Sequence, residues 1–192
     1  MTGLIILAAG ESSRLGQPKQ NLKFEGLTLL ERAVEAGRGS ACNKIVVVIG
    51  ANANKISPIP GTTIFYNRDW ITGMASSIRT GMLEFNSDPA IDKVIIMLCD
   101  QPFVDAVLLD NLINKQAETN KPIVAAVYNG TTGVPVLFGR SLFSELLSLN
   151  GTEGAKTILR THTDDIAVVP FEKGSIDIDT PQDYERLRGL NY

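Results

Sequence analysis

The sequence is poor in the residues on which several kinds of protein chemistry depend. Its 192 residues include two cysteines and one histidine. Cys42 and Cys99 lie in apolar stretches, and neither has a second cysteine at Cys-x-x-Cys spacing. The sequence therefore predicts no disulfide framework and no cysteine-based metal site, and a reducing, cytoplasmic location suits it. The single histidine, His162, lies in a polar turn, so catalytic triads and histidine-rich metal sites have little support.

Long apolar runs and an excess of positive charge are also missing. Residues 1–7 are apolar, but they carry no cationic leader and reach Gly10 too soon for a secretory signal or a membrane span. We expect a first strand there and no membrane partner. The formal net charge is −3. Because DNA or RNA binding needs a broad positive field, no nucleic-acid partner is expected, and any anion must be held by a local site.

Short β-branched runs alternate with helical patterns along the chain. Nearly apolar strands, typical of a buried parallel sheet, are expected at residues 4–8, 44–49, 63–66, 94–99 and 123–127. Amphipathic helices are expected between them, at residues 28–38, 74–85 and 104–118. Thr28 and Glu31 have the spacing of a capping box. This alternation predicts an α/β fold, and the absence of a linker or repeat predicts one domain over residues 1–192.

The pattern is looser in the last third of the chain. Residues 130–133 predict a turn, and a second turn is expected after residue 149. Strands are expected at 134–138, 166–169 and 175–178, and a short helix at 141–149. Thr180 and Pro181 predict the N-cap and first position of a final helix.

A loop rich in glycine, serine and basic residues follows the first strand. It offers backbone N–H groups around Gly10 together with the cations of Arg14 and Lys19, which is the combination that phosphates need. The spacing fits neither a P-loop nor a dinucleotide-binding Gly-x-Gly-x-x-Gly motif. The same composition also suits a plain strand-to-helix connection. Its place at the carboxyl end of a buried strand, where open α/β sheets bind ligands, favours the phosphate site.

Carboxylates follow two of the predicted strands. Asp100 comes directly after a central strand, and Asp177 and Asp179 precede the N-cap of the final helix. Carboxylates at such junctions suit a hard cation such as Mg²⁺, although helix capping and a solvated turn are the alternatives. Because alternate strand residues face opposite sides, the turn is the favoured interpretation for Asp177, while Asp100 and Asp179 are the candidate ligands.

Five motifs carry a resemblance to a known family. They are Leu-Ala-Ala-Gly-x-Ser-x-Arg-x-Gly-x-x-Lys at 7–19, Asn-x-x-Trp-x-x-Gly-Met-x-x-Ser-Ile-x-x-Gly at 67–81, Cys-Asp-Gln-Pro-Phe at 99–103, Gly-Val-Pro-Val-Leu-Phe at 133–138, and Asp-Ile-Asp-Thr-Pro-Gln-Asp at 177–183. With these motifs, in the family's order, the chain resembles the cytidylyltransferases of molybdenum cofactor biosynthesis. The resemblance implies a Rossmann-like three-layer sandwich with a mostly parallel central sheet, of the nucleotide-diphospho-sugar transferase type.

The resemblance implies roles for the residues of the first half. The nucleotide-binding residues would be Leu7, Ala8, Ala9, Gly10, Arg14, Lys19, Gly73, Ser77 and Asp100. Of these, Arg14, Lys19 and Asp100 would be catalytic, and Asp100 would ligate Mg²⁺ with Asp179. Related guanylyltransferases tend to have Leu-Ala-Gly-Gly in the loop and Asp-Met-Pro later, so Ala9 and Gln101 favour CTP.

The acceptor-binding residues that the resemblance implies are Asn67, Trp70, Gln101, Pro102, Gly133 and Lys156. Trp70 has two interpretations, since an aromatic side chain beside a glycine turn either stacks on a pterin ring or caps the core. At residues 151–156 this chain has Gly-Thr-Glu-Gly-Ala-Lys where the family often has Gly-Asp-x-Gly-Ala-Arg. Lys156 can meet a phosphate but lacks the bidentate fork of arginine.

These expectations combine into one reaction and several rivals. The expected activity is Mg²⁺-dependent transfer of CMP from CTP to the phosphate of molybdopterin, with release of pyrophosphate, and transient contact with a molybdoenzyme or its chaperone. One rival is a guanylyltransferase or a cytidylyltransferase that acts on another phosphorylated acceptor, such as a sugar phosphate. Another rival is a nucleotide-binding delivery module without catalysis.

Overall fold

A seven-stranded sheet forms the centre of the chain, in a computed structural model that describes residues 1–190; residues 191–192, the last two of the predicted domain, lie outside the described part. The strand order is β5-β4-β1-β6-β8-β7-β9. The strands are β1 (Thr2–Ala8), β4 (Lys44–Ile49), β5 (Thr63–Tyr66), β6 (Lys93–Leu98), β7 (Ile123–Tyr128), β8 (Thr131–Gly139) and β9 (Ile166–Pro170). Strand β8 runs antiparallel to both of its neighbours, and all other pairs are parallel. The prediction of a mostly parallel central sheet is confirmed.

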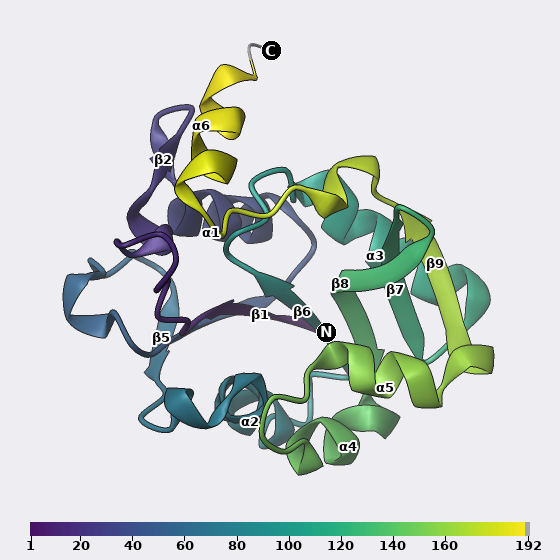
Figure 1. The fold of residues 1–192 in the computed structure, drawn as a ribbon. Coiled ribbons are helices and arrows are strands. Elements are labelled where there is room, and N and C mark those ends of the chain that lie inside the picture. Colours follow the sequence, from purple (N-terminus) through teal and green to yellow (C-terminus); the bar gives the residue numbers. More distant parts are fainter. Residues whose placement is uncertain (191–192) are drawn as a thin grey trace.

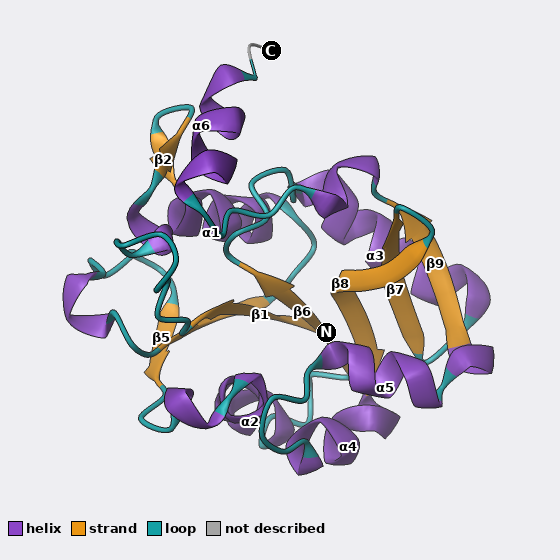
Figure 2. Cartoon of the chain, in the orientation of Figure 1, coloured by secondary structure: helices purple, strands orange, loops and turns teal. Residues whose placement is uncertain are grey.

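Helices cover both faces of this sheet. They are α1 (Leu29–Gly39), α2 (Met74–Asn86), α3 (Ala106–Thr119), α4 (Phe143–Ser148), α5 (Ala155–Thr161) and α6 (Pro181–Gly189). Figure 1 shows α1 and α3 on one side of the sheet and α2, α4 and α5 on the other, and Figure 2 shows the same layers by type of structure. None of the helices described over residues 1–190 has the length and apolarity to cross a membrane. The predicted three-layer Rossmann-like sandwich is confirmed.

The two cores follow from the alternation of side chains along the strands. Leu4 and Ile6 of β1 pack with α1 and α3, whereas Ile5 and Leu7 pack with α2 and α4. All four of these side chains are buried, so β1 is apolar throughout because both of its faces are covered. A smaller third cluster, which includes Leu15 and Leu187, packs α6 over the loop after β1 and the small hairpin of β2 (Lys23–Phe24) and β3 (Leu27–Thr28).

The predicted helix starts are confirmed. Thr28 and Glu31 form the predicted capping box at the start of α1. Thr180 caps α6 in the same manner with Asp183, and Pro181 occupies the first helical position. These caps satisfy backbone N–H groups that the first turn of a helix leaves without partners. The second cap has a consequence for the site, because it fixes the backbone directly after Asp179.

Two expectations for the last third of the chain are wrong, and one helix was not predicted. The turn predicted at 130–133 is only Asn129 and Gly130, which have φ values of 49° and 71°, and β8 begins at once after it. The turn expected after residue 149 is present at Gly151 and Thr152, and it leads into the unpredicted helix α5. Residues 175–178 are not a strand, because β9 is the edge strand and the chain then turns back across the ends of the central strands. On this return the Ile178 N–H donates to the Asp100 carbonyl at 3.1 Å.

Candidate active site

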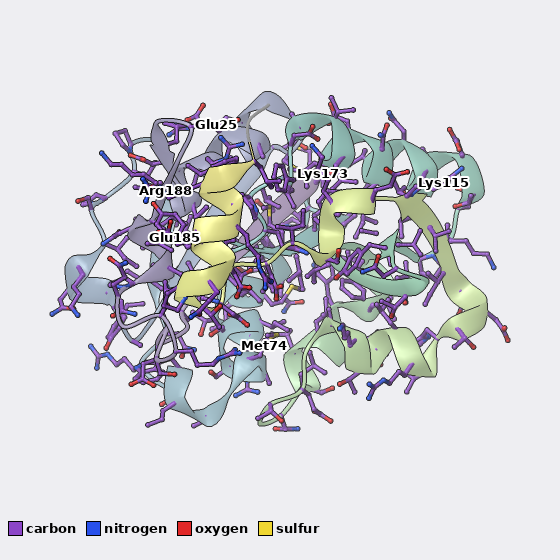
Figure 3. All side chains as sticks on the ribbon, turned by 45° about the horizontal axis from the view of Figure 1, so that its top comes forward. Glu25, Met74, Lys115, Lys173, Glu185 and Arg188 are labelled. Atoms are coloured by element: carbon purple, nitrogen blue, oxygen red, sulfur yellow. The ribbon has the colours of Figure 1, made fainter. Side chains whose placement is uncertain are left out.

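The loops that follow β1 and β6 meet at one edge of the sheet. The parallel register of these strands pairs Leu7 with Leu98, so Ala8 and Asp100 leave the sheet at the same edge. Two clefts open there, with volumes of about 570 Å³ and 580 Å³. Leu7, Met74, Leu98 and Asp177 line both clefts. Met74, labelled in Figure 3, begins α2 at this shared wall. Ligands bound in the two clefts would therefore be neighbours.

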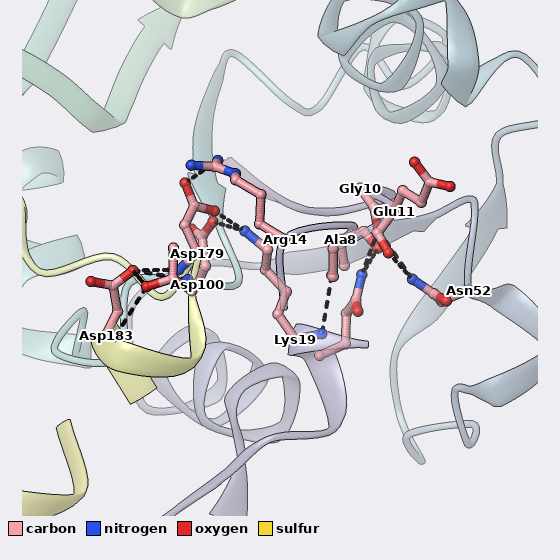
Figure 4. A network of polar contacts seen from close by, with 12 residues as sticks. Ala8, Gly10, Glu11, Arg14, Lys19, Asn52, Asp100, Asp179 and Asp183 are labelled. Carbon is pink, nitrogen blue, oxygen red and sulfur yellow. Dashed lines mark hydrogen bonds and ion pairs between the residues drawn. The ribbon is translucent and has the colours of Figure 1, made fainter. Parts of the chain in front are cut away.

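Two buried amides hold the loop after β1 in shape. The Gln20 side chain is 1% exposed, and its Nε2 donates to the carbonyls of Ala8 at 2.6 Å and Gly10 at 3.3 Å. The Asn52 Nδ2 donates to the carbonyls of Gly10 at 3.3 Å and Glu11 at 3.0 Å. Figure 4 shows these bonds around the loop. Because its carbonyls point toward these amides, the loop is fixed before any ligand binds.

Lys19 is the centre of the charged groups in the first cleft. Its Nζ donates to Asp100 Oδ2 at 2.8 Å and to Asp179 Oδ1 at 2.6 Å, and Arg14 donates to Asp179 Oδ2 at 2.8 Å (Figure 4). Lys19 and Asp100 are each 13% exposed in their side chains, whereas Arg14 is 69% exposed. The structure thus brings together all four charged residues that the sequence singled out for phosphate and metal binding.

The electrostatics of this cluster favour the charged forms of its members. Burial alone would lower the pKa of Lys19, but the Asp100 charge and the hydrogen bonds to Asp100 and Asp179 outweigh burial and raise that pKa well above its usual range. The hydrogen bond from Lys19, together with the charges of Lys19 and Arg14, lowers the pKa of Asp179. Lys19 and Asp179 therefore remain an ion pair across the physiological pH range.

The carboxylate oxygens fit a hard divalent cation. Asp100 Oδ1 is buried and has no hydrogen-bond partner within residues 1–190, so one lone-pair site of a central carboxylate stays open. Within residues 1–190, no group of three or more histidine, cysteine or acidic side chains could hold a metal ion by itself. The residues present therefore supply part of a coordination shell, as in sites that Mg²⁺ shares with phosphates and water.

Asp177 takes a position that the sequence interpretation did not favour. Its side chain lines both clefts instead of lying in a remote solvated turn. Partial burial raises its pKa, and the charges of Asp100 and Asp179 add to this rise. The strand argument placed Asp177 away from the site because it assumed an extended pairing of residues 175–178, which does not form.

The predicted nucleotide-binding residues collect in the first cleft. Its lining includes Leu7, Ala8, Ala9, Gly10, Lys19, Gly73, Ser77 and Asp100. Arg14 lies at the rim, where it pairs with Asp179. Trp70, predicted to contact the acceptor, also lines the first cleft and is partly exposed, so it neither joins the second cleft nor caps the core. The structure places this indole near the Ala8–Gly10 segment.

The second cleft combines an apolar floor with cations. Ile78, Ile96 and Val134 form part of the floor, and Lys156 and Arg160 reach it from α5. These two cations form no ion pair within residues 1–190. Gln101 lines the cleft, and its Nε2 donates to the carbonyls of Val134 at 3.2 Å and Gly174 at 3.0 Å. Such a cleft suits an anionic ligand that has an apolar or planar body.

Three predicted acceptor residues do not line either cleft. Asn67 is 3% exposed and donates from Nδ2 to the hydroxyls of Ser76 and Ser77, so its amide holds the start of α2. Pro102 lies on the far side of its loop, where its carbonyl accepts from Arg32. Gly133 is buried beneath Tyr128, whose hydroxyl occupies the space that a side chain at residue 133 would need. Gly133 thus acts on the second cleft only by making room for Tyr128.

Several residues of the site escaped sequence reasoning. Gln20, Asn52, Tyr128 and Arg160 line or support the clefts without belonging to a local pattern. Arg160 had one available signal, since it follows Lys156 by four residues and a helix would put both on one face. His162, as expected, is outside both linings, and its Nε2 lies 2.8 Å from Glu145 Oε2.

Solved structures share this architecture over nearly the whole chain. The structure of Rv0371c from Mycobacterium tuberculosis matches with a TM-score of 0.84 and 27% identity, over 98% of this chain and 97% of that one. A second structure of that protein, described as a complex with manganese, matches with a TM-score of 0.82 and 25% identity, over 99% of both chains. The fold is that of a Rossmann-like nucleotidyltransferase.

The sequence comparisons define the family. Residues 4–166 match the model of the MobA-like NTP transferase domain. The chain belongs to this family and is a nucleotidyltransferase. Nicotine blue oxidoreductase of Paenarthrobacter nicotinovorans is 29% identical, over 95% of this chain and 94% of that protein. Purine catabolism protein PucB of Bacillus subtilis is 26% identical, over 96% and 94%. Molybdenum cofactor cytidylyltransferase of Escherichia coli is 26% identical, over 94% and 92%.

Proposed function

We propose that this protein transfers CMP from CTP to the phosphate of molybdopterin and releases pyrophosphate. The observation that carries the proposal is the shared wall of the two clefts. The charged cluster of Lys19, Asp100 and Asp179 lies in the first cleft, and Asp177 and Met74 border both. An α-phosphate held at that boundary is open to attack from a group bound in the second cleft, which is the requirement for in-line displacement.

The phosphate loop would bind the nucleotide. Ala8, Ala9 and Gly10 frame the base and ribose, with Ser77 and Gly73 opposite them in the same lining. Lys19 and Arg14 hold the triphosphate, since their ammonium and guanidinium groups are charge-assisted donors beside the open end of the loop. Asp100 and Asp179 would hold Mg²⁺, which when bound neutralises charge on the phosphates and on departing pyrophosphate.

The second cleft would bind the acceptor. Lys156 and Arg160 offer unpaired positive charge for an anion, and the floor at Ile78 and Val134 suits a ring system. An acceptor phosphate is already ionised near neutral pH, so the reaction needs no strong general base, in agreement with the position of His162 outside both clefts. Support for molybdopterin comes from the relative named molybdenum cofactor cytidylyltransferase. The product would pass in the cytoplasm to a molybdoenzyme or its chaperone.

The preference for CTP over GTP rests mainly on Ala9. Ala9 lines the first cleft beside the expected place of the base, and its methyl group lies against Gly50. Gln101, the other residue that favoured CTP in the sequence, lines only the second cleft, so it faces the acceptor instead of the base. Replacement of Ala9 by Gly is expected to lower the ratio of the kcat/KM values for CTP and GTP.

The reaction is tested by mass spectrometry of the product after incubation with CTP, Mg²⁺ and molybdopterin. A cytosine dinucleotide product supports the proposal. A parallel screen of pyrophosphate release uses all four nucleotides and acceptors that include sugar phosphates. Pyrophosphate release only with GTP, or only with a sugar phosphate, would assign the protein to another transfer reaction. Tight CTP binding with no pyrophosphate from any acceptor would assign it to nucleotide delivery.

The role of the carboxylates is tested by Asp100→Asn. Loss of a ligand in a preorganised charged site is expected to lower kcat roughly 100-fold or more. Asp164→Asn is the matched control, because Asp164 is an exposed residue of the turn before β9 and lines neither cleft. Unchanged CTP consumption by Asp100→Asn would remove Asp100 from the catalytic site.

A further inference from the structure

Three of the four carboxylate oxygens of Asp100 and Asp179 form ion pairs with cations of the loop after β1. Lys19 Nζ donates to one oxygen of Asp100 at 2.8 Å and to one oxygen of Asp179 at 2.6 Å. Arg14 donates to the second oxygen of Asp179 at 2.8 Å. The remaining oxygen, Asp100 Oδ1, is buried and has no hydrogen-bond partner in the described chain. Lys19 and Arg14, both from the loop after β1, thus cover every oxygen of the two carboxylates except Asp100 Oδ1.

The same groups have two sets of proposed partners. Asp100 and Asp179 are the proposed ligands of the divalent cation, and Lys19 and Arg14 are the proposed ligands of the triphosphate. A divalent cation bound to Asp179 while Lys19 stays in place would put two positive centres within about 4 Å of each other, where their repulsion is strong in a partly buried site. The two arrangements therefore exclude each other.

We infer that Lys19 holds the place of the divalent cation until a nucleotide arrives, and that the triphosphate opens the metal site by taking Lys19 and Arg14 away from the carboxylates. The inference rests on the proposed function for the identity of the two ligands. In this exchange each cation keeps an anionic partner, since phosphate replaces carboxylate, and each carboxylate gains the metal in place of the loop cation. No buried charge is left unpaired at any stage.

The local structure permits such an exchange without a change of fold. The backbone N–H of Lys19 donates to Ser12 Oγ at 3.1 Å, and Gln20, the next residue, is locked to the Ala8 and Gly10 carbonyls. The backbone at Lys19 is therefore fixed, and Lys19 moves only through the four methylene groups of its side chain, while Arg14 moves as an exposed side chain. Rotamer changes of this kind are fast and need no rearrangement of the loop.

A consequence is that metal and nucleotide bind with positive coupling. Metal alone meets a closed site, whereas nucleotide removes the obstacle, and by linkage metal then strengthens the binding of nucleotide by the same factor. The chain would thereby avoid a metal-blocked cleft in the absence of substrate.

The first experiment measures Mn²⁺ binding to the full chain without nucleotide, by isothermal titration and by the EPR signal of free Mn²⁺. Lys19→Met is expected to bind Mn²⁺ roughly tenfold more tightly than the natural protein, within the usual range of coupling between sites. Arg14→Met should give a smaller gain, because Arg14 is exposed and covers one oxygen only. Lys23→Met is the matched control, since it removes the same charge from an exposed residue of β2 outside the first cleft and should change nothing.

The second experiment measures CTP binding in EDTA, with no metal present. Asp179→Asn is expected to bind CTP several-fold more tightly than the natural protein, because Arg14 then has no carboxylate to leave and Lys19 has only Asp100 to leave instead of two carboxylates. Asp177→Asn is the control for general charge, since Asp177 lines the same cleft but forms no ion pair within residues 1–190. Loss of any carboxylate from this cleft also relieves repulsion of the triphosphate, so Asp177→Asn should give a smaller gain, and equal gains in the two variants would contradict the role of the Lys19 and Arg14 ion pairs.

The inference would be overturned if Lys19→Met bound Mn²⁺ no more tightly than the natural protein does, while circular dichroism showed that the variant is folded. If Lys19→Met did not fold, Arg14→Met and the EDTA comparison decide, and no gain in either would overturn it as well. These outcomes are separable from failure of the proposed function. A protein that binds no CTP and releases no pyrophosphate fails the proposed function, whereas the Mn²⁺ comparison still reports on Lys19.

Discussion

Gly73 lies directly against the backbone of Gly151, where a side chain at residue 73 would meet the Gly151 carbonyl group. The same carbonyl accepts from the N–H of Ala75 at 3.3 Å. The contact joins the start of α2, which lines the first cleft, to the loop whose next residue, Thr152, lines the second. Gly73 also has a φ of 115°, which side-chain-bearing residues rarely adopt. Both clefts therefore depend on a glycine at this position.

Gly73→Ala is expected to destabilise the protein by about 2 kcal/mol or more, from backbone strain and from collision with residue 151. The measurement is urea unfolding followed by circular dichroism. Gly189→Ala serves as the control, because a Cβ there meets no atom within 4 Å, and its effect should stay within about 0.5 kcal/mol. Equal stability of the two variants would contradict the close contact.

Gly133→Ala should weaken acceptor binding while it leaves nucleotide binding intact. A Cβ at residue 133 would displace the Tyr128 hydroxyl, and Tyr128 lines only the second cleft. Steady-state kinetics should show a KM for the acceptor about tenfold higher, equivalent to about 1.4 kcal/mol of binding, with an unchanged KM for the nucleotide. In a Tyr128→Ala background the same substitution should add little, because the collision no longer exists. An equal effect in both backgrounds would refute the proposed path through Tyr128.

The stability that Lys19 supplies should depend on pH in two directions. The pKa of Asp179 is lowered on folding. Its contribution to the free energy of unfolding is therefore present above the pKa of the unfolded chain, about 3.9, and is lost as pH falls through the lower pKa of the folded protein. The pKa of Lys19 is raised, so its contribution is complete below about 10.4 and declines as pH rises beyond that value. The difference in unfolding free energy between the natural protein and Lys19→Met should therefore be level from about pH 5 to 9, at about 1 to 3 kcal/mol, and shrink at both ends.

Urea unfolding at a series of pH values checks this profile, with Lys23→Met as the control. A difference that stays constant down to pH 2 would show that Lys19 is not stabilised by the two carboxylates. The decrease of this difference above about pH 10 tests the same ion pairs through deprotonation of Lys19.

Both thiols should react slowly in the folded protein. Burial raises the pKa of Cys42 to about 11, and it raises the pKa of Cys99 further. At pH 8 the thiolate of Cys42 would amount to about one thousandth of the total, against about a quarter for a free cysteine. At this pH, Cys42 should react with a chromogenic disulfide a few hundred times more slowly than glutathione does, and Cys99 more slowly still. In urea, where the protein is unfolded, both thiols should react rapidly. Rapid labelling of either cysteine under native conditions would contradict this expectation.

The sequence predicted the parts of the molecule that depend on local or periodic patterns. Four buried strands, the partly exposed edge strand β5, α1 with its capping box, and the position of Asp100 at a strand end all follow from neighbours within a few residues. The positions of the residues between these elements were harder to predict, because they depend on contacts with residues far away in the sequence. Gln20 and Asn52 shape the phosphate loop through bonds to backbone carbonyls, and no periodicity marks such bonds in advance.

The path of residues 175–178 shows why part of the site could not be predicted. Their alternation of side chains is typical of a strand, but the sheet has no partner for them at that edge of the fold. Instead they cross above Asp100, and this crossing puts Asp177 at the boundary of the two clefts and Asp179 beside Lys19. Strand propensity reflects only the local sequence, whereas the conformation of this segment depends on whether the sheet offers it a neighbouring strand.

The antiparallel strand β8 separates the sheet into two parts that border different clefts. On one side of it, β5, β4, β1 and β6 run in the same direction and present the phosphate loop; on the other side, the β7–β8 hairpin supplies Tyr128 and Val134 to the second cleft. A tight hairpin can exchange its tip residues without altering the register of the parallel strands. Substitutions in this hairpin can therefore change the second cleft while the loop after β1 stays the same, which makes the fold a starting point for engineering the ligand of one cleft independently of the other.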